Sequence, residues 1–66
     1  MTGVLKVLWT VRRRDREYRA ELFSLGDHVE LRIIRDGSLM FAQAWPSEQA
    51  AIKESEAYRA LLVDVL

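Results

Sequence analysis

The stretch Leu25-Gly26-Asp27-His28-Val29-Glu30-Leu31-Arg32-Ile33-Ile34-Arg35-Asp36-Gly37-Ser38 decides the fold of this chain. It places a β-rich segment, Val29 to Ile34, between two glycine turns. An Asp-Gly loop is a strong hairpin signal, because a type I′ turn needs a positive φ at both central residues and its twist matches that of the strands. The stretch therefore predicts a strand that pairs on both sides through tight turns.

Three further β-rich segments extend this arrangement: Val4 to Val11, Glu17 to Leu25 and Leu39 to Trp45. They alternate in side-chain character or hold many β-branched and aromatic residues. A polar turn, Arg13-Arg14-Asp15-Arg16, separates the first two segments. We expect a four-stranded antiparallel meander with the strands in sequence order.

Counting outward from the loops predicts the register, since a one-residue slip would exchange the two faces of a strand. The predicted pairs are Ile34–Leu39, Ile33–Met40, Arg32–Phe41, Leu31–Ala42, Leu22–Leu31, Ala20–Ile33, Glu21–Arg32, Arg12–Glu17, Trp9–Ala20 and Val7–Leu22. This register puts Val29, Leu31 and Ile33 on an inner face, where the small Ala42 and Ala44 leave room for a covering helix. It also places two opposite-charge pairs across strands.

A helix is predicted from Glu48 onward. In Trp45-Pro46-Ser47-Glu48, proline ends the last strand, serine is a good N-cap and the acid suits the start of a helix dipole. One apolar stripe faces the sheet: Ala51, Ser55, Tyr58, Leu62 and Val65 or Leu66. Leu61 and Val63 lie off this stripe, so residues 61–66 fit a fraying helix end, a short terminal strand or partner contacts. The predicted fold is α+β, a single domain over residues 1–66.

Composition narrows the ways in which so small a domain is stabilised. The chain has 66 residues, no cysteine and one histidine, which excludes disulfides and the common structural zinc sites. Small scaffolds without these supports often rely on oligomerisation. No apolar run approaches the length of a membrane span, and the first residues do not look like a secretory signal, so the expected location is the cytoplasm.

The outer face of the predicted sheet is about half apolar, whereas a solvated sheet face is mostly polar. We therefore expect a homodimer, or an unknown protein partner, bound through this face or through the edge strands. Isolated exposed apolar residues remain the simpler alternative. The candidate interface residues are Leu8, Phe23, Leu25, Ile34, Leu39, Phe41 and Trp45.

A second hypothesis is weak binding of single-stranded nucleic acid. Residues 1–19 hold six cations and two acids, and arginine side chains match the geometry of phosphate. The candidate contacts are Arg12, Arg13, Arg14, Arg16 and Arg32, with Phe41 and Trp45 as stacking platforms. The formal net charge of zero argues against a dedicated nucleic-acid binder, and charged turns are often merely solvated.

The sequence holds no motif for catalysis, a cofactor or a metal ion. His28 is the only histidine, with Glu30 and Trp45 as its predicted neighbours, so a triad or metal centre has little to build on. The carboxylates Glu21, Asp27 and Glu30 would need a cleft to act as a general acid and base, and a flat sheet supplies none. We expect no enzymatic activity.

The segment from Trp9 to Leu62 resembles a loose class of small uncharacterised bacterial proteins. The shared features are a β-meander with an Arg-Asp-Gly turn and a Pro-Ser-Glu-Gln-Ala helix start, here Arg35-Asp36-Gly37 and residues 46–50. This resemblance implies the fold and no activity. The architecture is also similar to PUR-repeat and Whirly-type modules, which have four strands and a helix and bind single-stranded nucleic acid as dimers or paired repeats.

Overall fold

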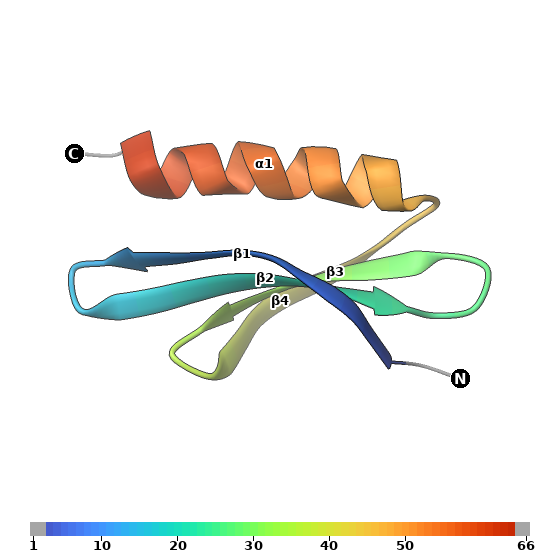
Figure 1. Cartoon of the computed structure of the whole chain (residues 1–66), viewed down its shortest axis with the longest axis horizontal. Helices are drawn as coiled ribbons and strands as arrows, with labels where there is room; N and C mark the ends of the chain where they lie inside the picture. Colours follow the sequence, from blue (N-terminus) through green and yellow to red (C-terminus); the bar gives the residue numbers. More distant parts are fainter. Residues whose placement is uncertain (1–2, 65–66) are drawn as a thin grey trace.

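The computed structural model describes residues 3–64, which form one antiparallel sheet and one helix (Figure 1). The elements are β1 (Gly3–Arg13), β2 (Arg16–Ser24), β3 (Val29–Arg35), β4 (Ser38–Trp45) and α1 (Glu48–Asp64). The strands lie in the order β1-β2-β3-β4, and α1 packs on one face of the sheet. The predicted α+β meander with a C-terminal helix is confirmed. In this order β1 and β4 are the two edges of the sheet.

The tight turns use left-handed backbone conformations. Arg14 and Asp15 have φ values of 51° and 67°, and Asp36 and Gly37 have φ values of 51° and 84°. Both central residues of each loop thus meet the requirement of a type I′ turn. In the β2–β3 connection only Gly26 is left-handed, with a φ of 94°, a conformation that glycine reaches without a Cβ penalty. These left-handed residues let the chain reverse direction within a few residues, so consecutive strands are joined by short connections.

The core lies between α1 and the inner face of the sheet. Leu22, Leu31 and Ile33 are fully buried from the sheet side, and Ala51 and Ser55 are fully buried from the helix side. Burying one large aliphatic side chain stabilises the fold by about 1.5–3 kcal/mol. The predicted inner stripe of the helix is therefore confirmed, and its last members, Val65 or Leu66, lie outside the described residues.

Both ends of α1 are anchored. Ser47 is the predicted N-cap: its Oγ accepts a hydrogen bond from the Ala50 N–H at 3.2 Å. At the other end the Arg13 guanidinium of β1 donates to the Leu62 carbonyl at 2.8 Å. The helix continues to Asp64, so Leu61 and Val63 are helical, and both side chains are exposed.

The predicted register of β4 is wrong beyond its first pairs. Ile34 lies opposite Leu39 as expected, but Ile33 lies opposite Phe41 instead of Met40. An extra residue at Met40 forms a β-bulge, which offsets all later pairs by one residue. Because side chains alternate along a strand, this offset exchanges the faces on which the later β4 residues lie.

The exchange of faces brings the aromatic residues of β4 into the core. Phe41 and Trp45 pack against the buried cluster beneath the helix. The Phe41 and Tyr58 ring centroids are 5.4 Å apart, in a tilted arrangement. Ala42 and Ala44, predicted to lie beneath the helix, are exposed on the outer face instead.

The register of β1 is partly confirmed. Trp9 lies opposite Ala20 as predicted, but Val7 lies opposite Glu21 rather than Leu22. The pairing shifts twice along this strand, between Val4 and Lys6 and between Val7 and Trp9. As a result Val7, which was expected beneath the helix, is half exposed.

Candidate protein-interaction surface

The part of the chain that the structure describes has no concave site. No cavity opens there, and no three His, Cys, Asp or Glu side chains gather closely enough to hold a metal ion. No helix among the described residues is sufficiently long and apolar to cross a membrane.

The single histidine contacts its neighbour in the chain. His28 Nδ1 lies 2.7 Å from the exposed Asp27 Oδ1, and this hydrogen bond lowers the pKa of the Asp27 carboxyl below its ordinary value of 3.8.

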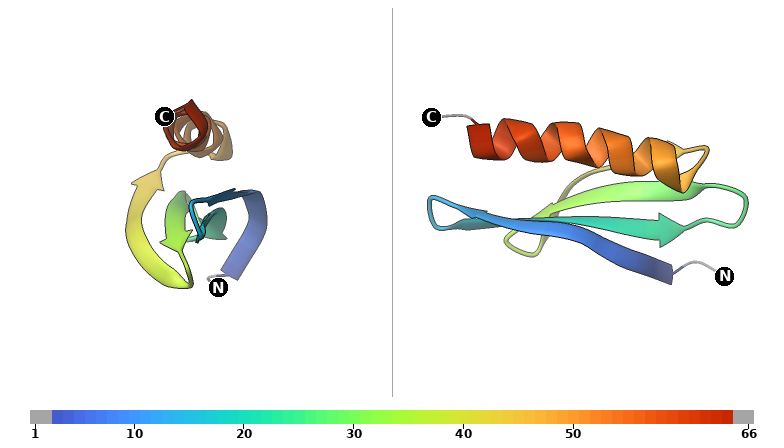
Figure 2. Two further views of the ribbon diagram at one scale, coloured as in Figure 1. Left: turned by 90° about the vertical axis from the view of Figure 1, so that its left-hand side faces the viewer. Right: turned by 45° about the horizontal axis from the view of Figure 1, so that its top comes forward.

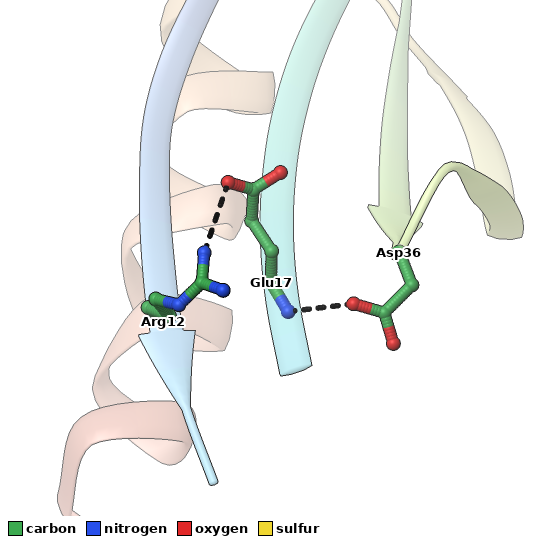
Figure 3. Close-up of polar contacts among 3 residues, drawn as sticks. All are labelled: Arg12, Glu17 and Asp36. Carbon is green, nitrogen blue, oxygen red and sulfur yellow. Dashed lines mark hydrogen bonds and ion pairs between the residues drawn. The ribbon is translucent and has the colours of Figure 1, made fainter. Parts of the chain in front are cut away.

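Most arginines of the predicted phosphate-binding cluster make contacts within the chain. Figure 3 shows Arg12 beside Glu17, with Nη1 and Oε2 3.9 Å apart, and the Glu17 N–H donating to Asp36 Oδ1 at 2.9 Å. Arg16 Nη1 lies 3.5 Å from the second oxygen of Asp36. Arg13 is the residue that binds the end of the helix. These guanidinium groups hold the two turns and α1 together at one end of the sheet.

Ion pairs and a cation–π contact occupy the outer face. The Arg32 guanidinium carbon lies 3.7 Å from the centroid of the Phe23 ring, and Arg32 also pairs with Glu30. Arg19 Nε lies 2.9 Å from Glu21 Oε2. Glu21 and Arg32 are direct neighbours across β2 and β3 as predicted, yet each side chain pairs along its own strand.

The predicted interface residues divide into two groups. Phe23 and Ile34 lie half-buried on the outer face beside the exposed Leu39, and Leu25 lies half-buried in the β2–β3 connection. The remaining three pack against the core and therefore do not lie on the outer face where the sequence analysis placed them: Leu8, Phe41 and Trp45. The outer face therefore carries fewer large apolar side chains than the sequence predicted.

The most exposed large apolar side chains lie on the edge strands and near the end of α1. Among the described residues they are Val4, Leu5 and Val7 of β1, Leu39 and Met40 of β4, and Leu61 and Val63 of the helix. Sheet edges carry unpaired backbone N–H and C=O groups, so apolar side chains there favour pairing with another strand.

The two edges are protected to different degrees. The β1 edge is interrupted by two irregularities and carries Lys6, Arg12 and Arg13, which are common devices against edge-to-edge pairing. The β4 edge carries no charged residue and no proline, and six of its eight residues are exposed. We call residues 41–45 of β4, which follow its bulge, the open edge. The end-on view in Figure 2 shows β4 at the border of the sheet.

Sequence reasoning missed the exposure of Ala42 and Ala44, which it placed beneath the helix. The available signal was the spacing of Phe41 and Trp45, since two aromatic side chains four residues apart lie on one face of a strand and favour the core.

Comparison with known proteins adds no relative. No protein-family model, no curated protein and no solved structure matches the chain. The resemblance to small bacterial β-meander proteins stays a prediction.

Proposed function

We propose that this protein is a small, non-catalytic, cytoplasmic interaction module that associates with a second copy of itself through its sheet. The observation that carries this proposal is the uncharged, exposed edge of β4. Beyond the bulge at Met40, residues 41–45 form a regular edge without lysine, proline or inward charge, and such an edge is a template for pairing with another chain. The contrast with the interrupted and cationic β1 favours β4 as the associating edge.

The small core supports association on energetic grounds. Only six hydrophobic side chains among residues 3–64 are buried, and two of them are alanines. A domain of this size without disulfides gains little from its own core. Pairing with a second copy stabilises the folded chain by mass action, so the stability rises with protein concentration above the dissociation constant.

Sedimentation velocity with a micromolar concentration series tests the proposal. We expect a dimer of the 7.7 kDa chain whose dissociation constant changes little between 0.1 and 1 M salt, because apolar and backbone contacts are not screened. A monomer throughout the series contradicts the proposal. Binding to single-stranded oligonucleotides that weakens steeply with salt would instead support the nucleic-acid hypothesis.

A further inference from the structure

The open edge reads almost the same in both directions. Its sequence is Phe41-Ala42-Gln43-Ala44-Trp45, an aromatic residue and an alanine on each side of a central glutamine. We propose that two copies of the chain pair their β4 strands antiparallel about a twofold axis at Gln43, which joins the two sheets into one. This inference rests on the proposed self-association and specifies its geometry.

Part of the open edge directs its backbone N–H and C=O groups away from β3, where a partner strand is able to bond to them. A two-residue loop is closed by a hydrogen-bonded pair, here Arg35 and Ser38. Hydrogen-bonded and non-hydrogen-bonded pairs alternate along an antiparallel ladder, so Arg32 and its partner Ala42 form a non-hydrogen-bonded pair. Ala42 therefore directs its N–H and C=O away from β3, and so does Ala44, two residues further along.

Only one twofold-symmetric register lets the backbone N–H and C=O groups of both Ala42 and Ala44 bond to the partner strand. With the axis at Gln43, Ala42 lies opposite the partner's Ala44, and each of these two equivalent pairs exchanges two hydrogen bonds. An axis at Ala42 would draw the bulged Met40 into the ladder. An axis at Ala44 would set Ala42 against the partner's Pro46, which has no N–H to donate.

Both ends of the open edge fit the same axis. The bulge at Met40 precedes it, and Pro46 follows it. Under the proposed symmetry Met40 of one copy lies opposite the partner's Pro46, so the irregular backbone of each chain falls outside the shared ladder. The regular part of the ladder then has the same five residues on both sides.

The side chains are also self-complementary. On the helix-covered face, Phe41 meets the partner's Trp45, and aromatic cross-strand pairs stabilise sheets by about 0.2–1 kcal/mol relative to alanine pairs. Gln43 meets its own copy on the axis, where two amides are able to donate to and accept from each other. On the outer face alanine meets alanine, and no like charges oppose one another along the open edge.

A charge-swap experiment tests the position of the axis. In Gln43→Glu and in Gln43→Lys, two like charges oppose each other, so each variant alone is expected to dimerise at least about tenfold more weakly than the parent protein. Mixing the two variants places opposite charges on the axis and should restore a heterodimer, measured by native mass spectrometry. The matched control pair is Gln49→Glu and Gln49→Lys, which alters an exposed glutamine of α1.

A single cysteine gives a second readout, since the chain has none. Opposite residues of a non-hydrogen-bonded pair have closely spaced Cβ atoms, so Gln43→Cys is expected to form a disulfide-linked dimer under mild oxidation much faster than Gln49→Cys. Urea unfolding of each variant establishes that the fold is retained.

The outcomes separate the two proposals. A monomeric parent protein overturns both of them. A dimer that forms equally well in both charged variants, without preference for the mixture, overturns the β4 pairing and leaves self-association through another surface.

Discussion

The Asp36 carboxylate accepts a hydrogen bond from the backbone N–H of Glu17 at 2.9 Å, while the Asp36 N–H donates to the Glu17 carbonyl at 2.8 Å. The turn between β3 and β4 is thereby bonded to the start of β2 rather than projecting into solvent. Arg12, beside Glu17 (Figure 3), adds charge to the same junction. Arg16, whose Nη1 lies 3.5 Å from Asp36 Oδ2, does the same.

Replacing Asp36 tests this junction. Asp36→Ala removes the acceptor for the Glu17 N–H and puts alanine at a φ of 51°, so we expect the free energy of unfolding in urea to fall by about 1–3 kcal/mol. Asp36→Asn keeps an acceptor oxygen and tolerates the left-handed conformation, and should lose less than half as much. Equal losses in the two variants would contradict this account, because they would assign the effect to the Asp36 charge beside Arg16.

Truncation of a core leucine tests the packing of the helix on the sheet. Leu31→Ala is expected to reduce the free energy of unfolding by about 2–5 kcal/mol, a large part of the roughly 3–10 kcal/mol expected for a domain of this length. The control is Leu61→Ala in α1, whose side chain is 64% exposed and whose replacement should change stability by less than about 1 kcal/mol. Similar effects at both sites would contradict the described core.

The bulge in β4 makes a direct prediction about two neighbouring residues. Phe41→Ala removes the ring that contacts Tyr58 and should reduce stability by about 2 kcal/mol or more, whereas Met40→Ala should have less than half that effect. Urea unfolding is measured at low protein concentration, so that association contributes little. The reverse order of effects would favour the regular register without a bulge.

The contact between Asp27 and His28 gives a pH dependence with a definite sign. The hydrogen bond with His28 lowers the pKa of Asp27 in the folded state, so its contribution to stability is present above pH 3.8 and is lost as the pH falls through the lowered pKa. In His28→Ala, the pKa of Asp27, followed by NMR of the side-chain carboxyl carbon, is expected to rise toward 3.8. An unchanged titration curve would contradict this account.

The turns explain why much of the fold was predictable. Positive φ values at Asp36 and Gly37 and at Gly26 set the strand order and the complete register of β2 against β3. These signals are local, so they are readable from a few neighbouring residues. Ser47 and Glu48 gave the start of the helix in the same way.

The bulges explain why the interaction surface was not predictable to the same degree. Counting by two from the Asp36-Gly37 loop leaves Phe41 and Trp45 on the outer face, yet burying two aromatic rings outweighs the irregularity of one extra residue at Met40. That choice depends on the space beneath α1, which no short segment specifies. The exposure of Ala42 and Ala44 on the outer face follows from it.

The hydrogen bond from Arg13 to the Leu62 carbonyl joins residues 49 positions apart, whereas every strand pairing joins consecutive strands. The meander can therefore grow by short loop closures, and the long closure between β1 and the helix end is expected late in folding. In the native state, local unfolding is expected to begin with the loss of this contact at the end of the helix. Fast amide exchange over the last helical turn, with slow exchange in β2 and β3, is the expected signature.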